Sequence, residues 1–126
     1  MIEGLFQALS LSTLMWLTLG VMIGMIVGTL PGLTATMGTA LLVPFTFALP
    51  TGEGIAMLGG LYVCAMFSDA IPACLVNTPG TPAAMATAFD GHPMVVKGRG
   101  QEAIVASCFS SALGTVFGAG CYLLLA

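Results

Sequence analysis

Apolar residues fill long stretches of this 126-residue chain, and short polar or helix-breaking positions separate them. No charged side chain occurs between Glu3 and Glu53, and Leu30-Pro31-Gly32 interrupts this run near its middle. A helix needs about 20 apolar residues to cross a hydrocarbon core of about 30 Å. The uncharged run is therefore long enough for two crossings, with a break in the helix between them.

This pattern predicts an all-α, polytopic integral membrane protein with discontinuous or re-entrant helices. Segment 33–49 is short for a crossing, contains Pro44 and is followed by Pro50, so it is expected to be a half-helix. Backbone at membrane depth tolerates such breaks only against other protein or a wet cavity, and many transporters build their substrate sites there. The expected spanning helices cover about 11–30, 33–49, 54–76 and 103–126, with a polar connection over 77–102.

Composition supports the membrane assignment and excludes several classes of function. Hydrophobic residues make up 58% of the chain and charged residues only 6%, whereas a soluble domain has about 25% charged residues. Two basic residues cannot provide a nucleic-acid footprint, so no nucleic-acid partner is expected. The four cysteines form no CxxC pair and are interpreted as small hydrophobic residues, so no metal or other cofactor is expected.

Small residues at helical spacing predict two faces on which another helix can pack closely. One face lies in the first expected span and the other in the last. Their members are Gly20, Gly24 and Gly28, and then Ser107, Ser111, Gly114 and Gly118. The last span runs to Ala126 without a polar flank, and a membrane helix normally ends in interfacial residues. We therefore expect the chain to be the N-terminal piece of a longer protein.

An internal echo relates residues 30–40 to residues 78–88: Pro, Gly, Ala, Met, Thr and Ala recur at the same offset. In each copy a helix breaker precedes a small, hydroxyl-bearing segment able to start a helix. A helix N-terminus offers unpaired N–H groups and partial positive charge, which attract a carboxylate. The alternative is chance repetition in a chain rich in Ala, Thr, Gly and Pro. The candidate substrate-binding residues are Thr29, Pro31, Gly32, Thr34, Asn77, Thr78, Pro79, Gly80 and Thr81.

Asp69 is an acidic residue between two apolar runs. Such a residue inside a membrane segment is a candidate proton relay or cation ligand, so Asp69 is our coupling-ion candidate. The competing interpretation is structural: Ser68-Asp69-Ala70-Ile71-Pro72 fits a helix N-cap followed by a first turn that contains proline. The sequence leaves both roles open.

The segment Phe89-Asp90-Gly91-His92-Pro93 has the composition of a tight polar turn. Asp90 and His92 are a conceivable acid/base pair, but no nucleophile or second metal ligand lies near them in the sequence. We therefore predict a turn here, with neither catalysis nor metal binding.

Several motifs in order resemble the large membrane subunit of the tripartite tricarboxylate transporters, the TctA family. The motifs are Gly28-Thr29-Leu30-Pro31-Gly32-Leu33, Leu41-Leu42-Val43-Pro44-Phe45-Thr46, Asn77-Thr78-Pro79-Gly80-Thr81-Pro82, Ala86-Thr87-Ala88-Phe89-Asp90-Gly91-His92-Pro93-Met94 and Gly98-Arg99. The resemblance extends over nearly the whole chain from about Gly20. The Asn-x-Pro-Gly and Thr-Ala-x-Asp-Gly-x-Pro-Met blocks are its specific elements.

The resemblance implies a much longer permease in the bacterial plasma (inner) membrane, of which residues 1–126 form the N-terminal part. Its implied partners are a small membrane subunit, an extracytoplasmic solute-binding protein that delivers di- or tricarboxylates, and membrane lipid. Uptake would use a Na⁺ or H⁺ gradient, and the turns at Pro31-Gly32 and at 77–80 become the expected substrate or ion neighbourhood. One departure is Met66-Phe67-Ser68-Asp69, where the family usually has a Tyr-Gly-Gly-like stretch.

Two other classes of function compete with this transport hypothesis. The first is a membrane subunit that supports assembly without transporting anything. The second is an intramembrane hydrolase, for which the HExxH motif is missing and Asp69 lacks a second acid in a suitable motif. We therefore expect a permease and not an enzyme.

Overall fold

The computed structural model describes residues 10–125, and every regular element in that range is a helix. Three stretches are long and apolar enough to cross a membrane: Leu11–Thr29, Thr51–Val76 and Gly100–Leu125. This confirms the predicted all-α, multi-pass membrane class. The helices are α2 (Leu11–Thr29), α3 (Ala35–Thr46), α4 (Thr51–Ser68), α5 (Ala70–Val76), α6 (Pro82–Val96) and α7 (Gly100–Leu125).

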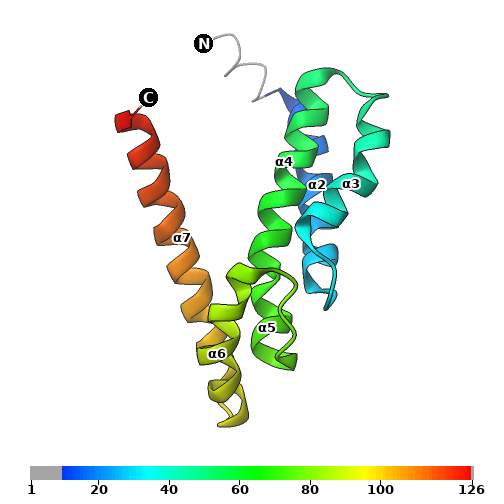
Figure 1. Cartoon of the computed structure of the whole chain (residues 1–126). Coiled ribbons are helices and arrows are strands. Elements are labelled where there is room, and N and C mark those ends of the chain that lie inside the picture. The colour runs from blue at the N-terminus through cyan, green and yellow to red at the C-terminus, as the bar shows by residue number, and fades with distance from the viewer. Residues whose placement is uncertain (1–9, 126) are drawn as a thin grey trace.

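Three glycines on one face of α2 let this helix pack closely against α4. Gly20, Gly24 and Gly28 are buried against α4, and a Cβ atom on Gly28 would overlap the carbonyl oxygen of Ala65. Gly20 faces Met57 in the same way, so the facing pairs advance together and the two helices run parallel. Figure 1 shows both helices running from the same end of the molecule. The prediction of a packing face on the first span is confirmed.

Because α2 and α4 are parallel, residues 30–50 must lead the chain back from the end of α2 to the start of α4. Residues 30–34 are non-helical, and α3 then covers 12 residues. At about 1.5 Å per residue, α3 is about 18 Å long and cannot by itself cross a core of about 30 Å. Figure 1 shows α3 covering only part of the path from the end of α2 to the start of α4. The first residues of α3 pack beside the middle of α4, where Gly38 lies close to Leu61. α3 ends at Thr46, and α4 begins at Thr51, directly after Pro50.

The third expected span is divided at Asp69 into α4 and α5. The backbone of Asp69 stays helical, with φ −62° and ψ −21°, and its N–H donates to the carbonyl of Ala65. α5 ends at Val76, and the next residue, Asn77, adopts the left-handed conformation with φ 55°. Asparagine tolerates this conformation better than most residues. It lets the chain reverse immediately after α5.

The predicted polar turn at 89–93 is wrong, because this segment lies within α6. The predicted polar connection over 77–102 lies between the membrane-length stretches Thr51–Val76 and Gly100–Leu125 and contains α6. Packing against α5 explains the difference. Gly91 is buried so closely against Cys74 that a Cβ on Gly91 would lie 2.5 Å from its sulfur, and Nδ1 of His92 lies 3.1 Å from the Cys74 carbonyl oxygen. Tertiary contacts of this kind override local turn propensity. The actual reversal occurs near Gly98, where φ is 79°.

α7 is the least covered helix of the described chain. It contacts α5 and α6, and Ala103 is its one buried residue. Figure 1 shows α7 leaning away from α4 toward its C-terminal end. The two helices border a groove of about 470 Å³, lined on α7 by Ser111, Gly114 and Thr115. A Cβ atom on Gly114 or Gly118 would meet nothing within 4 Å, so this part of the predicted packing face on the last span has no helix against it in the described residues.

Candidate functional site

The two Pro-Gly blocks lie together in space. We call residues 30–34 the first turn and residues 77–81 the second turn. A Cβ atom built on Gly80 would lie 2.8 Å from the carbonyl oxygen of Leu33 and 2.9 Å from Oδ1 of Asp69. The glycine thus permits a close approach between the second turn, the first turn and the α4–α5 junction. The two turns therefore lie on the same side of the molecule, as a site shared by both would require.

Asp69 is the charged residue at this meeting point. Its side chain is buried, with 2% of the residue exposed. Oδ1 accepts a hydrogen bond of 2.8 Å from the Gly80 N–H, and Oδ2 accepts one of 2.6 Å from the Thr81 hydroxyl. Asp69 stands at the N-cap position of α5 but makes no side-chain cap bond there. The predicted capping role is wrong for α5, because the carboxylate binds the segment that leads into α6.

Thr81 connects this carboxylate to the start of α6. Its hydroxyl oxygen accepts from the Ala84 N–H at 3.4 Å while the hydroxyl donates to Asp69. Negative charge near a helix N-terminus is favourable because the exposed N–H groups carry partial positive charge. Hydrogen bonds to an ionised acceptor are also stronger than neutral ones. The N-terminus of α6 is therefore already engaged by a carboxylate of the protein itself.

The first turn has a different environment. Thr34 caps α3 by accepting from the Met37 N–H at 3.2 Å, and its hydroxyl lies 2.8 Å from that of Thr36. No acidic residue occurs in the first turn of α3. Pro31 and Gly32 are exposed, and Gly32 has φ 90° with open space around it. The N-terminus of α3 is thus uncharged and open on this side.

Three other predicted site residues either hydrogen-bond to a nearby backbone carbonyl or are exposed on the surface. The hydroxyl of Thr29 donates to the Ile26 carbonyl at 2.9 Å, and that of Thr78 donates to the Val76 carbonyl at 3.1 Å. The side chain of Asn77 is exposed, and its backbone N–H donates to the Pro72 carbonyl. Their part in substrate binding stays a prediction, whereas their part in shaping the two turns is visible.

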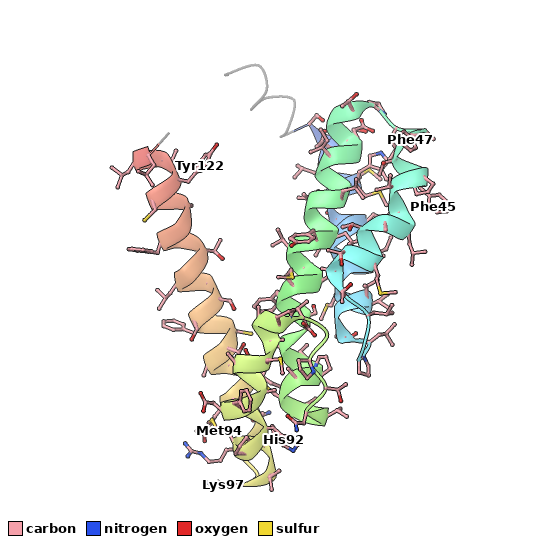
Figure 2. The ribbon with its side chains drawn as sticks, in the orientation of Figure 1. Phe45, Phe47, His92, Met94, Lys97 and Tyr122 are labelled. Atoms are coloured by element: carbon pink, nitrogen blue, oxygen red, sulfur yellow. The ribbon has the colours of Figure 1, made fainter. Side chains whose placement is uncertain are left out.

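The other charged side chains of the described residues lie away from the turns. Glu53 accepts a hydrogen bond of 2.7 Å from Ser12 at the beginning of α4. Arg99 pairs with Glu102 where α7 begins, and this hydrogen bond raises the pKa of Arg99. Figure 2 shows His92 and Lys97 at the same end of the molecule, where α6 leads into α7. No group of three or more His, Cys, Asp or Glu residues able to hold a metal ion occurs in the described part of the chain.

The sequence did not predict the bonds from Asp69 to Gly80 and Thr81 or the contact between Gly80 and Leu33. Asp69 precedes Gly80 by 11 positions, and nothing local fixes which donor an acid at that distance meets. A usable signal was the Pro-Gly-Thr-Pro order, since threonine before proline is a typical N-cap. That signal locates the donors but not their acceptor.

These features define a multi-pass membrane protein in which two Pro-Gly turns meet beside a buried carboxylate. The profile of the Tripartite tricarboxylate transporter TctA family matches residues 14–126. The chain belongs to this family. The predicted family resemblance is thereby confirmed.

Two curated relatives extend the comparison. An uncharacterised 52.8 kDa protein in the TAR-I ttuC' 3' region of Agrobacterium vitis is 38% identical over 94% of this chain and 22% of its own length. An uncharacterised protein of Methanocaldococcus jannaschii is 35% identical over 82% of this chain and 26% of its own length. The chain spans about a quarter of the length of these relatives. No solved structure matches it.

Proposed function

We propose that this chain is part of the membrane permease of a tripartite transporter that takes up di- or tricarboxylates. The supporting observation is the meeting of the two turns beside Asp69, within a chain of the TctA family. The proposed partners are a small membrane subunit and an extracytoplasmic solute-binding protein. The proposed location is the bacterial inner membrane, with lipid around the apolar surfaces of helices such as α7.

The open start of α3 is the proposed place for a substrate carboxylate. Its first N–H groups and the hydroxyls of Thr34 and Thr36 are neutral donors at a helix N-terminus, and no acidic side chain lies in its first turn. Binding by dipoles and hydroxyls is weaker than binding by a desolvated arginine. Weak binding suits a transporter, because the substrate must also be released.

Asp69 is the proposed coupling-ion residue. An acidic side chain buried in a membrane-spanning segment is expensive to keep and is typically functional. A cation or proton at Asp69 would reduce the negative charge beside the two turns before an anionic substrate arrives. This order of events would link substrate entry to a Na⁺ or H⁺ gradient.

Reconstituted uptake tests the proposal. The full-length protein, its small membrane partner and its solute-binding protein would be placed in proteoliposomes and offered labelled di- and tricarboxylates under a Na⁺ gradient, a pH gradient or neither. We expect uptake that depends on one gradient and falls at least tenfold in Asp69→Asn. Asp90→Asn is the matched control, because Asp90 is an exposed acid on α6.

The outcomes separate the competing functions. Co-purification of the three components without gradient-driven uptake would favour the non-transporting assembly subunit. Uptake with unchanged ion dependence in Asp69→Asn would retain the permease and remove Asp69 from coupling. Hydrolysis of the carboxylate substrate or of a membrane peptide would support the intramembrane hydrolase instead.

A further inference from the structure

Asp69 presents a carboxylate to donors that are typical of anion binding. The Gly80 N–H and the Thr81 hydroxyl each bond to a different oxygen of the same carboxylate. Backbone N–H groups and hydroxyls near a helix N-terminus are also how proteins bind carboxylates of ligands. The carboxylate belongs to the α4–α5 junction and not to α6. A side chain from one segment therefore occupies the anion-binding position at the start of another helix.

The negative charge of Asp69 has no basic partner in the described residues. The one ion pair there joins Arg99 and Glu102, at the start of α7. The charge of Asp69 is therefore balanced by neutral donors alone, inside a segment long and apolar enough to span a membrane. A second carboxylate brought to the same side of the turns would find both donors occupied. Whenever Asp69 carries no cation or proton, it would also meet a like charge, which is unfavourable at short range.

We propose that Asp69 is a specificity-determining residue whose carboxylate takes the place of a substrate carboxylate at the second turn. With Asp69 in that position, a substrate can place a carboxylate group only at the first turn. The protein therefore favours substrates with fewer carboxylate groups. This inference rests on the proposed function for its meaning in transport. Its physical basis, that a carboxylate-sized position exists between Gly80 and Thr81, is testable without transport.

The binding test uses the full-length protein in detergent and formate as the probe. Asp69→Ala removes the carboxylate and leaves the Gly80 N–H and the Thr81 hydroxyl without it. We expect a lower thermal midpoint for Asp69→Ala, most of which sodium formate restores and sodium chloride at equal ionic strength does not. The wild-type protein and Asp69→Asn should not respond to formate, because a side chain of the same size fills the position.

A second variant keeps the test decisive if Asp69→Ala does not fold. Asp69→Ser keeps a small polar side chain that is one atom too short to reach the Gly80 N–H, so it leaves space for formate and should show the same formate dependence. Adding Thr81→Val to either variant removes one donor and should abolish the formate effect. Equal responses to formate and chloride in a folded Asp69→Ala or Asp69→Ser protein would overturn the inference.

The transport arm measures charge selectivity in the reconstituted system. We expect Asp69→Ala to shift the ratio of tricarboxylate to monocarboxylate uptake upward by about tenfold, equivalent to about 1.4 kcal/mol. An unchanged ratio in an active variant would overturn the specificity role. Absent uptake in every protein would instead contradict the proposed function, and the formate result would still stand.

Discussion

The two turns share a local design and differ in what surrounds them. In each, Pro-Gly leads to a threonine that caps the next helix, Thr34 for α3 and Thr81 for α6. The first turn is exposed at Pro31 and Gly32 and has no acidic neighbour in the following helix turn. The second turn is fastened to the buried Asp69 by two hydrogen bonds.

The difference shows that tertiary contacts can give two similar motifs different affinities for an anion. A carboxylate already lies against the start of α6, so that helix end has lost its attraction for a second anion. The start of α3 has the same kind of donors without that carboxylate. Near-repetition in the sequence therefore indicates two similar helix starts and does not indicate two equivalent substrate sites.

Adding a methyl group to each glycine should give the largest contrast between the turns. In Gly80→Ala the new Cβ would lie 2.8 Å from the Leu33 carbonyl oxygen and 2.9 Å from Asp69 Oδ1, so we expect a loss of about 2–3 kcal/mol of stability. Gly32→Ala enters open space and meets only the strain of φ 90°, for which we expect about 1 kcal/mol. Unfolding of the full-length variants in detergent measures both. An equal or larger loss for Gly32→Ala would contradict the close contact at Gly80.

Removing the capping hydroxyls should give a smaller contrast. Thr81→Val loses the cap of α6 and a hydrogen bond to a charged acceptor, so we expect a loss of about 2 kcal/mol. Thr34→Val loses the cap of α3 and a bond to the neutral Thr36, so we expect about 1 kcal/mol. The same unfolding measurement applies, with Thr46→Val as a control, since Thr46 bonds only within α3. Equal losses for Thr81 and Thr34 would mean that the bond to Asp69 adds nothing to the cap.

Features with a local cause were predictable from the sequence. Glycines four residues apart at 20, 24 and 28 predicted a packing face because helical periodicity alone puts them together. The Pro-Gly blocks predicted two helix starts, since proline and threonine have strong positional preferences there. These inferences needed no knowledge of which segment would lie opposite.

Features that depend on distant contacts were not predictable. Asp90-Gly91 has turn composition, but burial of Gly91 against Cys74 holds it inside α6. Asp69 was correctly singled out as an unusual acid, yet its partners lie 11 and 12 positions away and are brought to it by the reversal at Asn77. The identity of the acceptor at the second turn is therefore a property of the fold and not of the motif.

The smallest change in stability, and the sharpest functional contrast, should come from the two exposed hydroxyls next to the caps. Thr36 bonds to Thr34 at the open first turn, whereas Thr78 donates to the Val76 carbonyl of its own helix end. Both lie on the surface, so Thr36→Val and Thr78→Val should each change stability by no more than about 0.5 kcal/mol. If the first turn binds the substrate carboxylate, Thr36→Val should raise the KM for uptake by about tenfold or more, since a hydrogen bond to a charged acceptor is worth about 1.5–3 kcal/mol. Thr78→Val should leave KM unchanged, because its hydroxyl already donates to the backbone. A raised KM for Thr78→Val with an unchanged KM for Thr36→Val would place the substrate at the second turn instead. Asp69 would then have to break its hydrogen bonds with Gly80 and Thr81 when the substrate binds.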